Sequence, residues 1–256
     1  MKDVQSEKDF RNVPLKKVGI NSLKWPIVVK EKHGGIQHTI ADMSLSVDLP
    51  SDVRGTHMSR FVELVHELQE ITPKEIERAL DRLKEKLHAK TAHIKIDFDY
   101  FIKKSSPVSG IISPNDIKCS FDAEKGEDFK FIMEVSVPVV TLCPCSKEIS
   151  EFGAHNQRAT VNIKIYTKKL IWIEDLVAIA EESASCPVFS LLKRKDEKYV
   201  TERAYLNPRF VEDVVREVAL RLDENKDILW YRVYVESMES IHNHNAFACT
   251  EKGEIL

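Results

Sequence analysis

The stretch at residues 140–163 holds the residue types best suited to chemistry in this chain. Cys143 and Cys145 are separated by one proline, and His155 follows ten residues after the second cysteine. Thiolates and imidazoles bind zinc and other divalent transition metals. Proline favours an extended backbone, so we expect the two cysteine side chains to point in opposite directions and only one to bind an ion. Two buried thiols without a role are the competing interpretation.

A second segment, residues 185–210, joins two expected helices and is rich in charge. We expect it to be a loop held against the core near Leu191. A carboxylate on this loop would complete a Cys/His/Glu set with an open water position, which is typical of a catalytic metal rather than a structural one. A solvated run of charges is the simpler interpretation.

Near the end of the chain, Glu239 keeps the odd-numbered parity of the apolar face of a strand expected at 229–235. A carboxylate there is partly desolvated, which suits a general acid or base, although backbone donors alone would also satisfy it. His242 and His244 follow on one face of the strand and suggest proton transfer or metal binding. Glu212 falls in the first turn of an expected helix, where a carboxylate commonly complements the helix dipole.

The apolar periodicity predicts two halves, each reading strand, strand, helix, helix, strand, strand. This pattern predicts an α+β fold of two tandem ββααββ modules, each an antiparallel sheet with paired helices on one face. Up-and-down connections would collect residues 143–156, 186–208 and 237–245 at one end of the second sheet. The expected division is an N-terminal tail at 1–14, a first module at 15–124 and a second module at 125–256 carrying most of the active site.

The expected strands span 23–30, 36–49, 94–100, 116–123, 128–141, 159–165, 229–235 and 245–250. Two helices are expected between residues 56 and 90, the second with Thr72 as its cap and Pro73 at its first position. A third is expected around residues 173–180, and a fourth with Asn207 as its cap and Pro208 in its first turn.

The composition narrows the function classes. A formal net charge of -3 gives no bulk positive charge for binding nucleic acid. No apolar run approaches the roughly 18 residues needed to cross a bilayer, and the first twenty residues lack the apolar core of a signal peptide. The five cysteines lack the spacing of a disulfide framework, so we expect them to be reduced thiols. We therefore expect a cytoplasmic protein that binds neither nucleic acid nor membrane.

Five spaced motifs, taken together, resemble GTP cyclohydrolase type IB over nearly the whole chain. They are GTHMSRFV at 55–62, LCPCSKEISEFGAHNQR at 142–158, SCPVFSLLKRKDE at 185–197, FVEDVVR at 210–216 and ESMESIHNHNAFA at 236–248. The resemblance implies the tunnelling fold, two modules per chain, and a homotetramer with active sites at module or subunit interfaces. It also implies conversion of GTP and water to 7,8-dihydroneopterin triphosphate and formate, the first step of tetrahydrofolate biosynthesis.

The resemblance further implies one divalent transition metal per site, zinc, manganese or iron(II). By position it implies metal ligation by Cys145, His155 and Glu197, guanine binding by Glu212, catalytic roles for Glu239, His242 and His244, and a place in the site for Cys143. Candidate cations for the triphosphate are Lys193, Arg194, His57 and Arg60, which are otherwise surface charges. The alternative functions are a related enzyme of this fold that releases a cyclic phosphate, and a purine-binding module without catalysis.

Overall fold

The computed structural model describes residues 4–5, 7–68 and 70–255, which form two compact units. Part of the predicted N-terminal tail, residues 1–3 and 6, lies outside the described residues. Unit 1 comprises Met1–Asp99 and Ser120–Ile132, and unit 2 comprises Tyr100–Cys119 and Met133–Leu256. Neither unit is therefore one continuous stretch of sequence.

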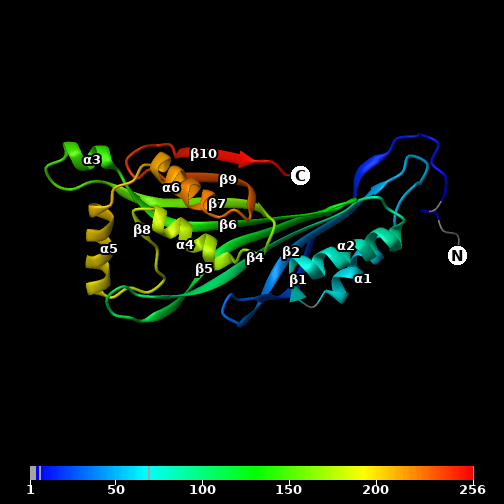
Figure 1. Ribbon diagram of the computed structural model, residues 1–256, viewed down its shortest axis with the longest axis horizontal. Coiled ribbons are helices and arrows are strands. Elements are labelled where there is room, and N and C mark those ends of the chain that lie inside the picture. The colour runs from blue at the N-terminus through cyan, green and yellow to red at the C-terminus, as the bar shows by residue number, and fades with distance from the viewer. Residues whose placement is uncertain (1–3, 6, 69, 256) are drawn as a thin grey trace. The chain divides into compact units, whose positions relative to one another are not determined.

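Three long strands contribute residues to both units (Figure 1). They are β4 (Ala92–Ser105), β5 (Ile112–Lys125) and β6 (Phe129–Leu142). Neighbouring strands are hydrogen-bonded in the order β10-β9-β7-β6-β5-β4-β2-β1-β3. Because β1 and β3 pair in parallel while β1–β2 and β7–β9 are antiparallel, the sheet is mixed.

Unit 1 is built on a long antiparallel pair covered by two helices. Its remaining elements are β1 (Leu15–Lys30), β2 (Ile36–Leu49), α1 (Ser59–Glu67), β3 (Glu70–Ile71) and α2 (Pro73–Leu87). Every second residue of the second half of β2 is buried, so one face of the strand enters the core. As predicted, Thr72 caps α2 by accepting a hydrogen bond from the backbone of Glu75, and Pro73 is the first helical residue.

β1 begins eight residues earlier than the strand predicted at 23–30. Its pairing with β2 shifts register between Leu15 and Val18 and again between Ile20 and Leu23. Each irregularity breaks the alternation of apolar and polar residues that marks a strand in the sequence. The first half of β1 therefore carries no clear period of two.

Unit 2 holds the remaining elements. They are α3 (Pro144–Ile149), β7 (Asn156–Thr167), α4 (Ile173–Ser183), β8 (Cys186–Pro187), α5 (Arg194–Leu206), α6 (Val211–Asp223), β9 (Ile228–Ser237) and β10 (Ala246–Gly253). Helices α4 and α6 pack against each other. α6 also packs on β9 and β10. The pairing of β7 with β9 places Ala159 opposite Ser237, which aligns the start of β7 with the end of β9.

The segment expected to be a charged loop forms α5, so that prediction is wrong. Of the helix residues only Asp196 and Ala204 are buried, and so α5 has no apolar stripe that would mark it in the sequence. Asn207 ends α5 instead of capping α6, because its N–H bonds to the carbonyls of Arg203 and Ala204. Pro208 follows as a helix stop, and α6 begins at Val211.

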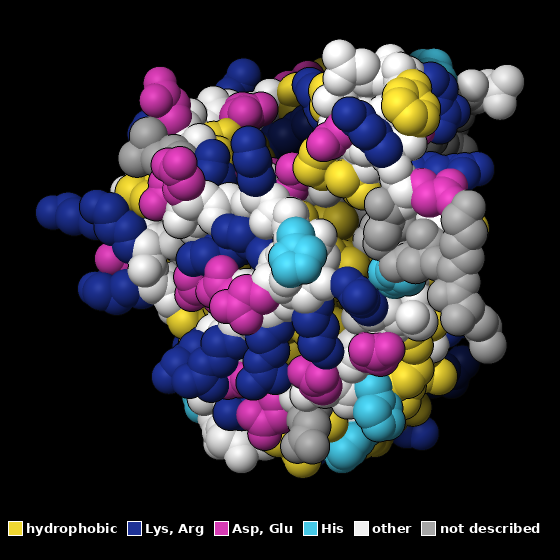
Figure 2. Space-filling view, turned by 90° about the vertical axis from the view of Figure 1, so that its right-hand side faces the viewer, with side chains coloured by type: hydrophobic (Ala, Val, Ile, Leu, Met, Phe, Trp, Pro, Cys, Tyr) yellow, Lys and Arg dark blue, Asp and Glu magenta, His cyan; other side chains and the backbone are white. Residues whose placement is uncertain are grey.

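Charged side chains of both signs are interspersed over the face drawn in Figure 2, in keeping with the formal net charge of -3. Among the described residues, no helix has the length and hydropathy needed to span a membrane. All five cysteines carry free thiols.

Candidate functional site

A pocket of about 370 Å³ lies in unit 2 where several element ends meet. Its volume falls within the range of small-molecule sites. The lining residues come from the end of β6, from α3, from the start of β7, from the start of α6, from the segment joining β9 to β10, and from the start of β10. They are Thr141, Cys143, Cys145, His155, Gln157, Arg209, Phe210, Val211, Glu212, Glu239, His242, His244, Ala246 and Phe247.

Backbone hydrogen bonds bring these ends together. The N–H of Cys143 donates to the carbonyl of His155 at 3.1 Å. The N–H of Arg209 donates to the carbonyl of Leu142 at 3.0 Å, which fixes the approach to α6 at the end of β6. Of the three segments predicted to meet at one end of the second sheet, residues from 143–156 and from 237–245 line the pocket, whereas no residue of 186–208 does.

Cys143 and Cys145 lie on either side of a helix start rather than on an extended strand. Cys143 is the N-cap of α3, and its Sγ accepts a hydrogen bond from the N–H of Ser146 at 3.4 Å. Pro144 occupies the first helical position, where its missing N–H costs nothing. The extended backbone predicted here holds for Cys143 but is wrong for Cys145, which is helical, and both cysteines line the pocket.

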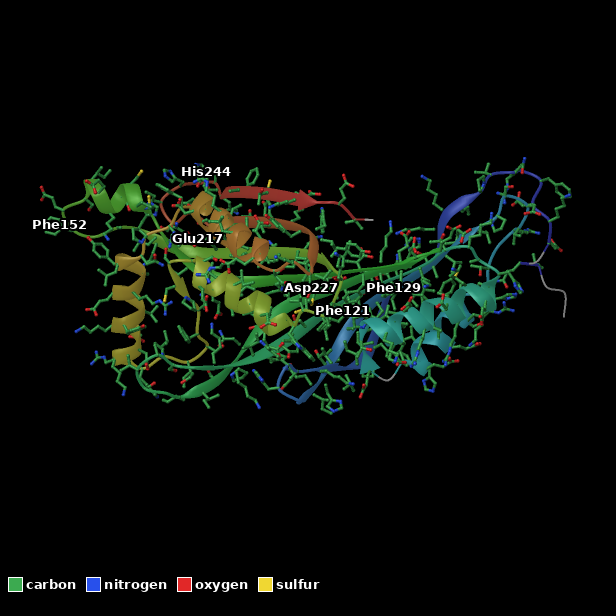
Figure 3. The ribbon with its side chains drawn as sticks, viewed as in Figure 1. Phe121, Phe129, Phe152, Glu217, Asp227 and His244 are labelled. Atoms are coloured by element: carbon green, nitrogen blue, oxygen red, sulfur yellow. The ribbon has the colours of Figure 1, made fainter. Side chains whose placement is uncertain are left out.

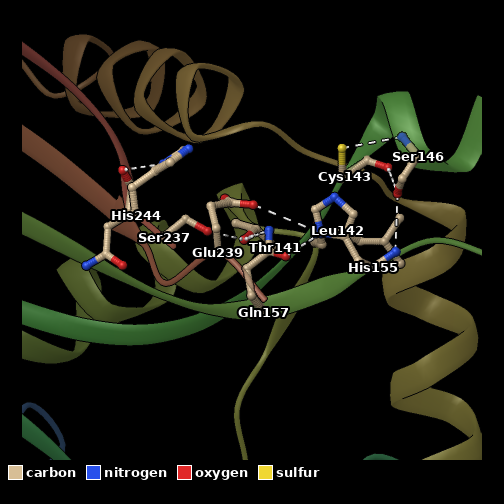
Figure 4. A network of polar contacts seen from close by, with 11 residues as sticks. Thr141, Leu142, Cys143, Ser146, His155, Gln157, Ser237, Glu239 and His244 are labelled. Carbon is tan, nitrogen blue, oxygen red and sulfur yellow. Dashed lines mark hydrogen bonds and ion pairs between the residues drawn. The ribbon is translucent and has the colours of Figure 1, made fainter. Parts of the chain in front are cut away.

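His155 is held by a chain of polar side chains (Figure 4). Its Nδ1 lies 2.9 Å from Oε1 of Gln157, and Nε2 of Gln157 donates to Oγ1 of Thr141 at 3.2 Å. The Thr141 hydroxyl is 3.2 Å from that of Ser237. The backbone N–H of His155 donates to Oγ of Ser146 at 3.2 Å, which links the histidine to the cysteine-bearing helix.

Glu239 lies next to this histidine, with one carboxylate oxygen 4.0 Å from Nδ1 of His155. Both side chains are largely buried, at 12% and 13% exposure respectively. A carboxylate and an imidazole this close can pass a proton through one bridging water, or directly once they approach to hydrogen-bond distance.

His242 and His244 lie in the segment between β9 and β10, not on a strand as predicted. Figure 3 labels His244 there. The segment is rich in Ser and Asn, which favour turns over strand pairing. The two rings nevertheless stack, with their centroids 5.1 Å apart and their planes at 13°. Both histidines line the pocket.

Glu212 reaches the pocket from the first turn of α6, the position predicted for it. Arg209 precedes that helix and was not singled out from the sequence. Its Nε donates to Oδ1 of Asn207 at 3.2 Å, and its Nη1 lies 3.6 Å from a carboxylate oxygen of Glu217. In the part of the chain that the structure describes, no other Lys or Arg lines the pocket.

Glu197 is not brought to the pocket within this chain. It is an exposed residue in the first turn of α5, while the last turn of that helix reaches α3 through a hydrogen bond from Lys147 to the carbonyl of Tyr205. Tyr205 lies eight positions after Glu197 on the helix, which corresponds to about 12 Å along the axis. Lys193 and Arg194 share the Glu197 end of the helix and are likewise absent from the pocket lining.

The other two candidate cations belong to unit 1. His57 lies just before α1, and Arg60 donates from Nη1 to the backbone carbonyl of Lys86 at the end of α2. Neither lines the pocket.

Two of the three predicted metal ligands line the pocket. Cys145 and His155 offer a soft thiolate and an imidazole, both of which bind zinc and iron(II). Over residues 4–5, 7–68 and 70–255, however, no group of three or more His, Cys, Asp or Glu is placed to hold a metal ion. Two of the three predicted ligands thus share the site, and the third is elsewhere on the chain.

Comparison with known proteins identifies the family. The family model described as "Type I GTP cyclohydrolase folE2" matches residues 1–248. The chain belongs to this family. It is 60% identical over 256 residues to GTP cyclohydrolase FolE2 of Thermotoga maritima, covering 100% of this chain and 99% of the relative. It is 59% identical over 255 residues to the enzyme of the same name from Caldicellulosiruptor bescii, with the same coverage.

Solved structures with very different sequences share the fold of this chain. The chain resembles uricase from Arthrobacter globiformis with a TM-score of 0.52 and 7% identity, covering 99% of this chain and 96% of that one. Urate oxidase from Bacillus subtilis gives 0.55 and 9%, over 93% and 98%. At such low identity the likeness concerns the α+β fold alone.

Proposed function

We propose that the chain is a metal-dependent GTP cyclohydrolase, acting in the cytoplasm, whose pocket in unit 2 opens the imidazole ring of guanine. The cyclohydrolase activity, hydrolysis of a cyclic amidine in the first step of folate biosynthesis, follows from family membership. The observation that carries the mechanism is the convergence of Cys143, Cys145, His155, Glu212, Glu239, His242 and His244 on one pocket. These residues come from three of the five motifs.

Each pocket residue has a task in this reaction. Glu212 accepts hydrogen bonds from the N–H groups of the guanine edge and orients the base, because a carboxylate can accept two parallel bonds. Cys145 and His155 would hold the metal, which would supply a water of lowered pKa for attack at C8. Glu239, His242 and His244 move protons to and from the ring nitrogens and the departing formate. Cys143 contacts the substrate or the other ligands from the cap of α3.

Glu197 remains the proposed third ligand. In this chain it is separated from Cys145 and His155, so it joins them only if α5 moves or if a second copy of the chain supplies it. We favour the second copy, in line with a homotetramer of tandem tunnelling-fold modules whose active sites lie at interfaces. Exposed apolar side chains near the pocket and α3, such as Phe152 at 94% and Phe247 at 65%, support association.

The decisive experiment is turnover of GTP by metal-stripped protein after addition of Zn²⁺, Mn²⁺ or Fe²⁺ in turn. Formate and the pterin product are measured together. We expect formate only after metal addition, together with 7,8-dihydroneopterin triphosphate, and a loss of roughly 10²–10⁴-fold in Glu239→Gln, as expected for a general acid or base. Glu202→Gln, an exposed residue of α5, serves as a control that keeps wild-type turnover.

Other outcomes identify the alternatives. Full turnover in metal-free protein refutes the metal dependence. Formate accompanied by a cyclic phosphate indicates the related reaction on the same fold. GTP binding without any formate indicates a purine-binding module.

A further inference from the structure

The chain of hydrogen bonds behind His155 is buried at its far end. Thr141 and Ser237 are 1% and 0% exposed, so their hydroxyls have little access to water. The series of hydrogen bonds continues from the Thr141 hydroxyl through the side-chain amide of Gln157 to Nδ1 of His155. A buried polar chain of this kind is stable when each donor faces an acceptor.

The direction at His155 follows from the groups facing Nδ1. The Gln157 oxygen, 2.9 Å away, can only accept a hydrogen bond. A carboxylate oxygen of Glu239, 4.0 Å away, also attracts a proton rather than a lone pair. Both neighbours therefore favour a proton on Nδ1, which leaves the lone pair of the neutral ring on Nε2. Figure 4 shows the ring lying between Gln157 and Cys143.

We propose that Gln157 is a positioning residue that holds His155 as the Nδ1–H tautomer, with the Nε2 lone pair available to the pocket. The opposite tautomer would place an N–H where a ligand lone pair is needed, and no metal could bind there. The link to metal binding rests on the proposed function, whereas the tautomer itself does not. Gln157 falls within the 142–158 motif, but a glutamine at the start of a strand has no chemistry that singles it out, and no role was predicted for it.

The same pair of strands offers a matched control. Oγ of Ser136 on β6 donates to Oδ1 of Asn162 on β7 at 2.5 Å, so an amide again bonds a hydroxyl across these strands. Neither residue lines the pocket. Asn162→Leu removes a comparable amide from β7 without touching His155.

The first measurement is nitrogen NMR of histidine-labelled full-length protein without metal, well above the pH range in which imidazoles titrate. His155→Asn identifies the signals. We expect Nδ1 of His155 to be protonated and Nε2 bare in the wild type, and a shift toward the Nε2–H form in Gln157→Met. Gln157→Glu should keep the wild-type tautomer, because a carboxylate also accepts from Nδ1–H. A wild-type His155 that carries its proton on Nε2 overturns the proposal, and that test requires no folded variant.

The second measurement is the affinity of metal-stripped protein for Zn²⁺ and Mn²⁺ alone. We expect Gln157→Met to bind roughly 10–100-fold more weakly, as for other residues that orient a ligating histidine. Gln157→Glu and Asn162→Leu should stay within a few-fold of the wild type. Unchanged affinity in Gln157→Met overturns the positioning role. If the wild type binds no metal, the metal dependence of the proposed function fails, while the tautomer spectra still decide the role of Gln157.

Discussion

Arg209 supplies the fixed positive charge of the pocket among the described residues that line it. Its guanidinium is oriented by Asn207 on one side and Glu217 on the other, so it is a preformed donor rather than a mobile surface charge. In the proposed function GTP would bring several phosphate charges to this pocket, and a guanidinium binds phosphate through two parallel hydrogen bonds. Arg209 is thus a better candidate for the triphosphate than Lys193 or Arg194 within one chain.

Replacing Arg209 by methionine should weaken GTP binding while leaving the proton-transfer groups in place. A lost charge-assisted hydrogen bond is worth about 2 kcal/mol, which corresponds to a rise in KM of roughly 30-fold. Steady-state kinetics of formate release measures this change. Arg216→Met on α6, the helix that follows Arg209, is the control, since the Arg216 side chain is 73% exposed. An equal KM for the two variants would remove Arg209 from the substrate site.

Single residues were predictable when their type and spacing carried chemistry. Cys143, Cys145 and His155 stood out for that reason, and the structure places them around one pocket. Gln157 and Arg209 did not stand out, since an amide and a lone arginine have no distinctive pattern. Their roles depend on tertiary neighbours. The end of β6 lies beside the start of β7, which carries Gln157, and beside the segment before α6, which carries Arg209.

At the scale of elements, the side chain of Asp196 holds the start of α5 in place. Asp196 is 0% exposed and accepts hydrogen bonds from the backbones of Val108 and Ser109 at 2.8 and 2.7 Å, from the Ser109 hydroxyl at 2.6 Å, and from the backbone of Lys193 at 2.9 Å. It therefore caps α5 and fastens the β4–β5 turn to it. Burial alone raises the pKa of this carboxyl, but the hydrogen bonds outweigh that effect and hold the pKa well below its usual range.

Asp196→Asn should destabilise unit 2, and the effect should depend on pH in a defined direction. Because the folded state lowers the pKa, the stabilisation is fully present above the ordinary value of 3.8 and is lost as the pH falls toward the folded value. The gap in unfolding free energy between wild type and variant is therefore largest near neutral pH and narrows in acid. Urea unfolding at several pH values measures it.

Glu202→Gln, on the same helix with a side chain 60% exposed, should show no such dependence. A gap for Asp196→Asn that is constant from neutral pH into acid would show that the carboxylate charge is not what holds the turn.

Most of the long elements could be predicted because their buried faces keep a regular period. β2 and α2 are examples, with buried residues at every second position and at three- and four-residue intervals respectively. Where tertiary hydrogen bonds replace an apolar stripe, as in α5, the sequence gives no such signal. A proline alone did not show whether a helix begins or ends at that point, because Pro144 begins a helix whereas Pro208 follows the end of one.

At the scale of the whole molecule, the location of Glu197 makes the assembly testable. If Cys145 and His155 come from one chain and Glu197 from a neighbour, two inactive variants can complement each other. In mixed oligomers of C145A and E197A, a site is intact when its cysteine comes from an E197A chain and its glutamate from a C145A chain. Random equal mixing gives one half times one half, or about one quarter of wild-type sites.

The measurement is formate release after co-refolding the two variants. C145A mixed with H155A is the control and should remain inactive, because both ligands must come from the same chain. Absence of recovery in the C145A and E197A mixture would mean that Glu197 acts with the ligands of its own chain, or with none.

The fold class could be predicted from the order of elements, and the α+β assignment holds. The division into tandem modules at residue 125 stays a prediction, since the two compact units divide the chain differently. That division depends on how far β4, β5 and β6 extend, and strand length is poorly specified by a period of two alone.

The shared strands have a consequence for how the chain is made. Residues 100–119, at the turn between β4 and β5, belong to unit 2, but the ribosome delivers them before the 124 residues of Met133–Leu256. At about 5–20 residues per second, this segment waits roughly 6–25 s for its partners. During that time Tyr100, Ile117 and Cys119, all buried in the finished protein, have no core to enter. We therefore expect nascent chains of this enzyme to expose these apolar side chains at one defined stage of synthesis, before unit 2 is complete.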